Sequence, residues 1–210
     1  MWTNEGTQSL AALSDTTDHR MEAVIASVKP VILSLTDKGK TLISIITDFP
    51  LNQYRNKKSF YLIQELAVLL KIIIRWIYLE SGHGKGIPDG IGAVVKRGIV
   101  DLIASHPDQP VYNVSDLVQL ELADLLPSVQ LYEYSQEDIV QIFDTIPDLI
   151  PISGTLKLHE IQTHVNKDGD NYFLIKDTSD QDPWCVKLTV KKGNTKVMQL
   201  KSNICPQANN

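Results

Sequence analysis

The chain has 210 residues, of which 43% are apolar and 21% are charged, and its formal net charge is −5 at pH 7. This composition is ordinary for a folded protein and excludes a largely disordered chain, a collagen-like fibre and a coiled-coil rod. The longest apolar run, residues 66–79, contains Lys71 and Arg75 and falls short of the roughly 20 apolar residues that span a bilayer. We therefore expect no membrane segment.

The predicted elements alternate between helix and strand over the first half of the chain. Apolar residues recur at helical spacing over residues 18–35, and the β-branched run at 41–47 is typical of a buried strand. A second helix is expected at 56–70 and a second buried strand at 72–79. A glycine-dense loop follows, and helical spacing resumes after it. This order predicts a layered α/β domain at residues 1–105.

The second half of the chain changes character twice. Residues 106–150 are acidic and are predicted to form short helices with a polar face, with Ser115 and Ser135 as caps. Past Pro151 we expect a small antiparallel, β-rich appendage at residues 151–210. Its strands are predicted at residues 156–163, 172–176, 184–191 and 196–200.

Charge is unevenly distributed along the chain. Residues 38–97 hold ten Lys/Arg against four Asp/Glu, a formal charge of +6, whereas residues 98–148 hold ten Asp/Glu and no Lys or Arg, a formal charge of −10. The basic block could contact a phosphate backbone, or it could pair with the acidic block beside it. Both interpretations stay open at this point.

The compartment is indicated by what the sequence lacks. The amino terminus has no basic start followed by an apolar stretch, as a secretory signal would. Cys185 and Cys205 are too few for a disulfide scaffold and suit a reducing compartment. We expect an intracellular protein, nuclear or cytoplasmic, that is not secreted.

Two acidic residues lie where open α/β sheets bind ligands. Asp48 ends the first predicted strand, and Asp89 lies beside Pro88 at the start of the helix after the second strand. Carboxylates in these places could share Mg²⁺ or Mn²⁺, as in enzymes that cleave phosphodiesters. The alternatives are a turn residue before Pro50 for Asp48 and a favourable charge at a helix N-terminus for Asp89. The intervening glycines match neither G-x-G-x-x-G nor a Walker motif.

Two sequence blocks give the chain a specific likeness. They are Asp48-Phe-Pro-Leu-Asn-Gln-Tyr-Arg-Asn-Lys57 and Glu80-Ser-Gly-His-Gly-Lys-Gly-Ile-Pro-Asp-Gly-Ile-Gly92, the latter followed by Lys96-Arg97. In this order and at this spacing they resemble two blocks of eukaryotic DNA-transposon transposases, S-D-G-P-[TS]-[TS]-Q-[YF]-[RK]-N-K and H-G-K-G-x-x-D-G-x-G-x-x-x-K-R. The resemblance covers about residues 15–165. It implies a partial ribonuclease-H-like layer of the DDE/D kind.

The resemblance also implies roles for individual residues. The implied catalytic group consists of Asp48, Asp89, Glu80 and His83. Within it, Asp48 and Asp89 would hold Mg²⁺ or Mn²⁺ weakly, with Glu80 as the rival of Asp89. Contacts with DNA phosphates are expected of Arg55, Lys57, Lys58, Lys85, Lys96 and Arg97.

Two departures from these blocks predict a loss of catalysis. Phe49 stands where the transposases have glycine, and the 47 residues before Asp48 leave no room for a strand that carries a first acid. We therefore expect a transposase-derived remnant with weak, non-specific and salt-sensitive DNA binding and no autonomous catalysis. The alternatives are an active metal-dependent nuclease or strand transferase, and a protein-interaction module that uses the acidic 98–148 face. An unpaired sheet edge would invite association, so a homo-oligomer or a protein partner is also expected.

Overall fold

The computed structural model describes residues 1–47, 54–79, 86–143, 146–150, 152, 154–165, 171–176 and 184–186. The chain forms two compact units. Unit 1 comprises residues 1–18 and 85–138, and unit 2 comprises residues 19–84 and 139–210. Each unit is therefore built from two separate stretches of chain, which differs from the expected division at residues 105 and 150.

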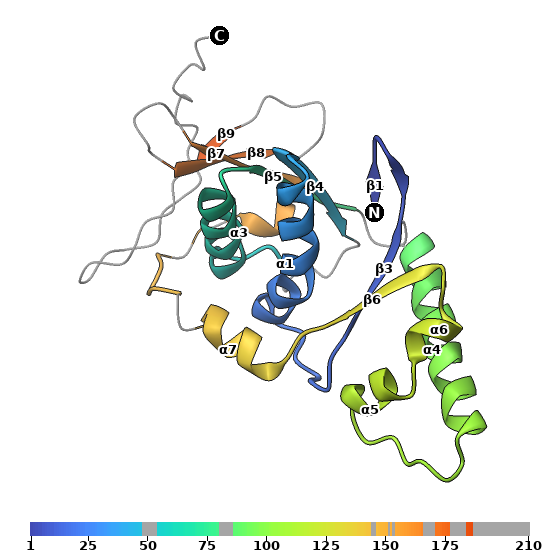
Figure 1. The fold of residues 1–210 in the computed structure, drawn as a ribbon. Helices are drawn as coiled ribbons and strands as arrows, with labels where there is room; N and C mark the ends of the chain where they lie inside the picture. Colours follow the sequence, from blue (N-terminus) through green and yellow to red (C-terminus); the bar gives the residue numbers. More distant parts are fainter. Residues whose placement is uncertain are drawn as a thin grey trace. The chain divides into compact units, whose positions relative to one another are not determined.

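Unit 2 contains a mixed five-stranded sheet (Figure 1). In sheet order its strands are β4 (Leu42–Thr47), β5 (Ile73–Tyr78), β7 (Glu160–Val165), β8 (Asn171–Lys176) and β9 (Trp184–Val186). β4 and β5 are adjacent and parallel, as their buried apolar runs predict, and every other neighbouring pair is antiparallel.

The carboxyl-terminal strands do not form a separate appendage, as the sequence suggested. β7 pairs with β5, with Trp76 opposite Ile161, so β7, β8 and β9 extend the sheet that β4 and β5 begin. The chain turns through a short 3₁₀ helix at Thr155–Lys157 before β7. The expected strand at residues 196–200 lies outside the described part of the chain.

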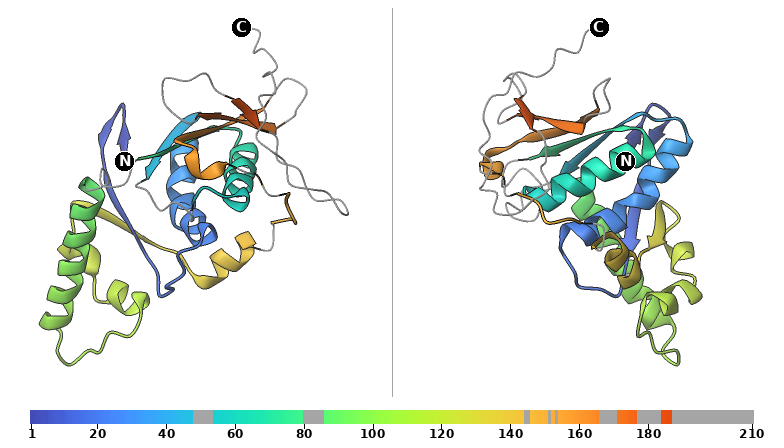
Figure 2. Two further views of the ribbon diagram at one scale, coloured as in Figure 1. Left: turned by 180° about the vertical axis from the view of Figure 1, so that it is seen from behind. Right: turned by 90° about the vertical axis from the view of Figure 1, so that its left-hand side faces the viewer.

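Two helices cover one face of this sheet, α1 (Met21–Asp37) and α3 (Lys57–Leu70) (Figure 2). α3 begins where the side chain of Asn56 accepts hydrogen bonds from the N–H groups of Lys58 and Ser59. It ends at Lys71, which adopts the left-handed conformation with φ of 55°. These two caps set both ends of the helix that leads from β4 to β5.

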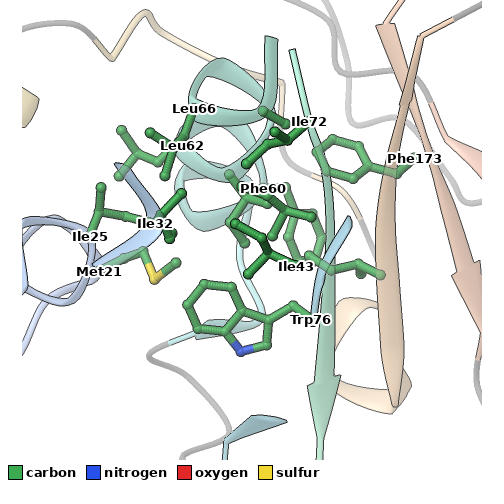
Figure 3. Close-up of a cluster of buried hydrophobic side chains, with 14 of the residues drawn as sticks. Met21, Ile25, Ile32, Ile43, Phe60, Leu62, Leu66, Ile72, Trp76 and Phe173 are labelled. Carbon is green, nitrogen blue, oxygen red and sulfur yellow. The ribbon is translucent and has the colours of Figure 1, made fainter. Parts of the chain in front are cut away.

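The core of unit 2 lies between these helices and the sheet. Along β5, Ile74, Trp76 and Tyr78 are buried while their neighbours are half-buried, the period of two that a strand with one covered face requires. Figure 3 shows Met21 of α1, Phe60 of α3 and Trp76 of β5 converging in this core. Burial of each such large side chain stabilises the folded state by about 1.5–3 kcal/mol. The core therefore fixes the positions of β4 and β5.

Unit 1 is built on a second, parallel pair of strands, β3 (Ser9–Leu13) and β6 (Val129–Glu133). Its helices are α4 (Ile87–Ser105), α5 (Val114–Gln119) and α6 (Leu122–Leu125), and its amino terminus forms a small hairpin of β1 (Trp2–Thr3) and β2 (Gly6–Thr7). β6 was not expected, because only helices are predicted over residues 106–150. Its pairing partner lies more than a hundred residues away, which no local pattern reveals.

The helix caps in this part of the chain are confirmed at one position and corrected at another. Ser135 and Asp138 bond reciprocally, since Ser135 Oγ accepts from Asp138 N–H and Asp138 Oδ2 accepts from Ser135 N–H, at the start of α7 (Gln136–Phe143). α5 is capped by Asn113 and not by Ser115, through a capping box with Asp116. Within the described residues, no helix is long and apolar enough to cross a membrane.

Candidate functional site at the ends of two parallel strands

β4 and β5 end side by side. Thr47 is in register with Tyr78, and the N–H of Leu79 donates to the carbonyl of Thr47 at 2.9 Å. The two transposase-like blocks start directly after these ends. Asp48, Glu80, His83 and Lys85 belong to those blocks and lie outside the described residues. The structure therefore describes the ends of β4 and β5, which the two blocks follow.

Three aromatic residues, Tyr54, Trp76 and Tyr78, make contacts at these strand ends. Trp76 Nε1 donates to Thr47 Oγ1 at 3.1 Å, and the Tyr78 hydroxyl donates to the carbonyl of Tyr54 at 3.1 Å. The rings of Tyr54 and Trp76 lie 5.9 Å apart. These contacts hold Thr47, which precedes the first block, and Tyr54, which lies within it, against the end of β5.

Arg55 is placed differently from its expected role at a DNA phosphate. The side chain is only 3% exposed, and its guanidinium carbon lies 4.7 Å from the centre of the Tyr78 ring. Burial lowers the pKa of Arg55, and burial raises the pKa of the Tyr78 hydroxyl, although the nearby Arg55 charge opposes the latter shift. A buried guanidinium stacked on a ring supports the strand end and does not present its charge to a polynucleotide.

Lys57 is also tied to the protein. Its ammonium donates to the carbonyl of Leu149 and lies 3.9 Å from Asp148 Oδ1. The side chain is half-buried, with 29% of its surface exposed. Lys57 thus joins the start of α3 to the segment that precedes β7.

The other described basic candidates are exposed. Lys58 lies in the first turn of α3, and Lys96 and Arg97 lie in the middle of α4. α3 belongs to unit 2 and α4 to unit 1, so the described basic candidates are divided between the two units.

Asp89 lies in the first turn of α4 and is exposed. Pro88 stands beside it, and the N–H of Asp89 donates to the carbonyl of Gly86, the residue that directly precedes the helix. These observations fit a negative charge at the positive end of a helix. The described residues contain no group of three or more His, Cys, Asp or Glu that could hold a metal ion. Of the two expected metal ligands, only Asp89 is described.

A polar cavity in unit 1 was not expected from the sequence. It has a volume of about 660 Å³ and lies where the parallel strands β3 and β6 both end. Four carboxylates and several hydroxyls line it: Asp15, Glu133, Glu137, Asp138, Ser14, Thr16, Thr17, Ser115 and Ser135. Asp15 Oδ1 accepts from the N–H of Val114 at 2.8 Å, which ties this loop to the start of α5.

The comparisons with known proteins identify a family without a known activity. A family model described as a domain of unknown function (DUF8701) matches residues 2–170. The chain belongs to this family. No curated protein matches the sequence, and no solved structure matches it. The matched range includes both transposase-like blocks and every residue that lines the cavity of unit 1.

Proposed function

We propose that this DUF8701 chain is a transposase-derived protein that binds nucleic acid weakly through a partial ribonuclease-H-like layer and has no autonomous catalysis. The observation that supports the proposal is the side-by-side ending of β4 and β5, from which both transposase-like blocks leave. The carboxyl ends of parallel strands are where open α/β sheets bind their ligands.

The charge of unit 2 supports a polyanionic ligand. Its residues include 17 Lys/Arg and 13 Asp/Glu, a formal charge of +4, whereas unit 1 holds three Lys/Arg and twelve Asp/Glu, a formal charge of −9. Lys58 carries an exposed positive charge at the end of α3 that is next to the first block. A modest positive charge gives weak affinity that falls as salt is raised, because binding releases counterions from the phosphates.

The test compares two exposed lysines at opposite ends of one helix. Lys58 lies in the first turn of α3 beside the strand ends, and Lys71 follows the last residue of the helix about 20 Å away. We expect Lys58→Gln to weaken binding of a fluorescent 30-nucleotide DNA about two- to threefold in a low-salt anisotropy titration, and Lys71→Gln to leave it unchanged. The slope of log affinity against log salt should also fall by about one for Lys58→Gln. Equal losses from the two variants, or binding by the native chain that ignores salt, would contradict a phosphate site at these strand ends.

A second candidate function is favoured by the polar cavity of unit 1. Its lining contains four carboxylates and no Lys, Arg or His, and unit 1 carries the formal charge of −9. Such a surface suits a basic segment of a protein partner, since opposite charges steer association and fix the register of a complex. This role is the protein-interaction module that the acidic 98–148 face suggested.

The corresponding experiment is calorimetric titration with a lysine-rich peptide. The double variant Glu133→Gln/Glu137→Gln removes two exposed carboxylates of the cavity, and Asp101→Asn/Asp108→Asn removes two exposed carboxylates elsewhere in unit 1. Both variants change the net charge equally. We expect the first to weaken binding at least fivefold and the second less than twofold. Equal effects would mean that the peptide responds to net charge and not to the cavity.

A further inference from the structure

The outer edge of β4 carries backbone groups that face away from the sheet. β4 stands at one end of the sheet order, and across the described ranges no strand pairs with its far side. The N–H of Ile73 donates to the carbonyl of Thr41 at 2.8 Å, and that of Leu79 donates to Thr47 at 2.9 Å. In a parallel pair, alternate residues of a strand face the partner. The odd-numbered residues of β4 therefore bond to β5, and Leu42, Ser44 and Ile46 direct their N–H and C=O groups outward.

The side chains along this edge offer no protection against pairing. Leu42 is 57% exposed and Ile46 is 52% exposed, and Ser44 between them is also exposed. The six residues of β4 contain no charge and no proline, the usual means by which proteins block an edge strand. An edge of this kind is a template for another strand.

We propose that the occupant is β4 of a second copy of this chain, paired antiparallel about a two-fold axis at Ser44. In this register Ser44 faces Ser44 of the second copy, and Leu42 faces its Ile46. Each of the three outward-facing residues then exchanges two N–H···O=C hydrogen bonds with the residue opposite it. The resulting six hydrogen bonds use every outward N–H and C=O group of Leu42, Ser44 and Ile46 in both copies. Shifting the register by two residues in either direction leaves only four such bonds.

The second copy is favoured over an unrelated strand because this edge is self-complementary. The two-fold axis keeps equivalent faces of the two sheets on the same side, so the exposed Leu42 and Ile46 cover each other while Ile43 and Ile45 continue the apolar face that α1 and α3 cover. Two six-residue edges bury less area than the roughly 1,200–2,000 Å² of stable interfaces. The dimer is therefore weak and reversible.

The first experiment blocks the edge without touching the fold. Ser44→Pro removes an N–H that points away from β5, and proline is tolerated on edge strands. In sedimentation velocity of the full chain from about 5 to 500 µM, we expect the native protein to shift reversibly from monomer to dimer. Ser44→Pro should stay monomeric with an unchanged circular dichroism spectrum, and Ser44→Thr should behave like the native chain. A native chain that stays monomeric throughout, or a folded Ser44→Pro variant that still dimerises, overturns the proposal.

The second experiment tests the register and does not depend on the proline variant folding. Leu42→Lys/Ile46→Lys sets like charges opposite each other across the two-fold axis, whereas Leu42→Lys/Ile46→Glu sets opposite charges there. Positions 42 and 46 are about 13 Å apart within one strand, so neither variant gains a contact inside its own chain. We expect at least a tenfold loss of dimerisation from the first variant and native or stronger dimerisation from the second at low salt. Equal losses from both variants overturn this register.

Discussion

The guanidinium of Arg55 lies over the ring of Tyr78, with its central carbon 4.7 Å from the ring centre. The hydroxyl of the same tyrosine donates to the carbonyl of Tyr54. Tyr78, at the end of β5, therefore contacts two consecutive residues of the first transposase-like block. Its hydroxyl binds the backbone of Tyr54, and its ring contacts the side chain of Arg55. These contacts hold Tyr54 and Arg55 beside the end of β5.

Arg55 should matter for stability and not directly for nucleic-acid binding. Arg55→Gln removes a buried cation–ring contact and leaves polar atoms in its place, so we expect the free energy of unfolding to fall by about 1–2 kcal/mol. Urea denaturation followed by tryptophan fluorescence measures this loss. The folded fraction of the variant should bind DNA as the native chain does. Lys58→Gln is the matched control, with a stability change below about 0.5 kcal/mol and a loss of DNA binding. The opposite pattern would restore Arg55 to a role at the phosphates.

The free energy of unfolding should fall as pH rises above about 10, because buried tyrosines keep their protons at a pH where unfolded tyrosines lose them. Burial raises the pKa of Tyr78 and of Tyr132, and burial together with the charge of Glu65 raises the pKa of Tyr61. Above a pH of about 10 the unfolded tyrosines lose their protons while the folded ones keep them. The unfolded state then binds fewer protons, so stability is retained below pH 10 and declines as pH rises toward the folded-state pKa values.

The measurement is urea unfolding at several pH values from 8 to about 11. We expect each strongly buried tyrosine to add a slope of about −1.4 kcal/mol per pH unit above pH 10. Tyr78→Phe should flatten this slope, because it removes the buried hydroxyl. At pH 8 the same variant should be about 1 kcal/mol less stable, since the Tyr54 carbonyl loses its donor. A native chain with unchanged stability up to pH 11 would contradict the burial of Tyr78.

The local patterns of the sequence predicted two neighbouring strands and the helices that follow them. The β-branched run at 41–47 and the apolar run at 72–79 became adjacent parallel strands, and the helices at 56–70 and after the glycine-dense loop were also found. These elements can be predicted locally because each has a strong pattern of apolar residues of its own. The mixed α/β class follows from their alternation.

The parts that sequence reasoning missed depend on contacts between distant residues. β6 is a short strand whose partner, β3, begins at Ser9, so neither the strand nor the cavity at its end has a local signature. The attachment of β7 to β5 is decided in the same way by pairing across more than eighty residues. Arg55 and Lys57 looked like surface cations because charge is visible in a sequence and burial is not. The alternating burial along β5, which only the structure shows, places Tyr78 toward the core.

Gln64 should be replaceable with a gain in stability. It lies on α3 and is 5% exposed, and among the residues that the structure describes neither its Nε2 nor its Oε1 has a hydrogen-bond partner. A buried amide without partners costs about 1–3 kcal/mol. We expect Gln64→Leu, which has a similar volume, to raise the free energy of unfolding by about 1 kcal/mol. Glu65→Leu on the exposed side of the same helix is the control and should change it by less than about 0.5 kcal/mol. A clear destabilisation by Gln64→Leu would show that the amide is satisfied.

Two glycines of α4 should respond in opposite ways to alanine. A Cβ at Gly98 would lie 2.9 Å from Cδ2 of Leu126, a buried residue that directly follows α6, whereas a Cβ at Gly92 would meet nothing within 4 Å. Alanine favours a helix interior by about 1 kcal/mol over glycine. Gly92→Ala should therefore stabilise the chain by up to about 1 kcal/mol, and Gly98→Ala should destabilise it by about 1–2 kcal/mol through overpacking. Thermal unfolding of the two variants side by side checks this, and equal stabilisation would mean that Leu126 moves aside freely.

For catalysis, the resemblance and the described geometry support different expectations. The transposase-like blocks imply that Asp48 and Asp89 hold a divalent metal, yet Asp89 is exposed in the first turn of α4, where a negative charge is favourable in itself. Two-metal cleavage of a phosphodiester needs several carboxylates around both ions. We expect the purified chain to nick no plasmid in the presence of Mn²⁺, and Asp48→Asn and Asp89→Asn to be equally silent. Asp89→Asn should instead lower the free energy of unfolding by about 0.3–1 kcal/mol at low ionic strength, an effect that added salt removes. Nicking by the native chain that both substitutions abolish would establish an active nuclease, because a contaminating enzyme would not respond to either change.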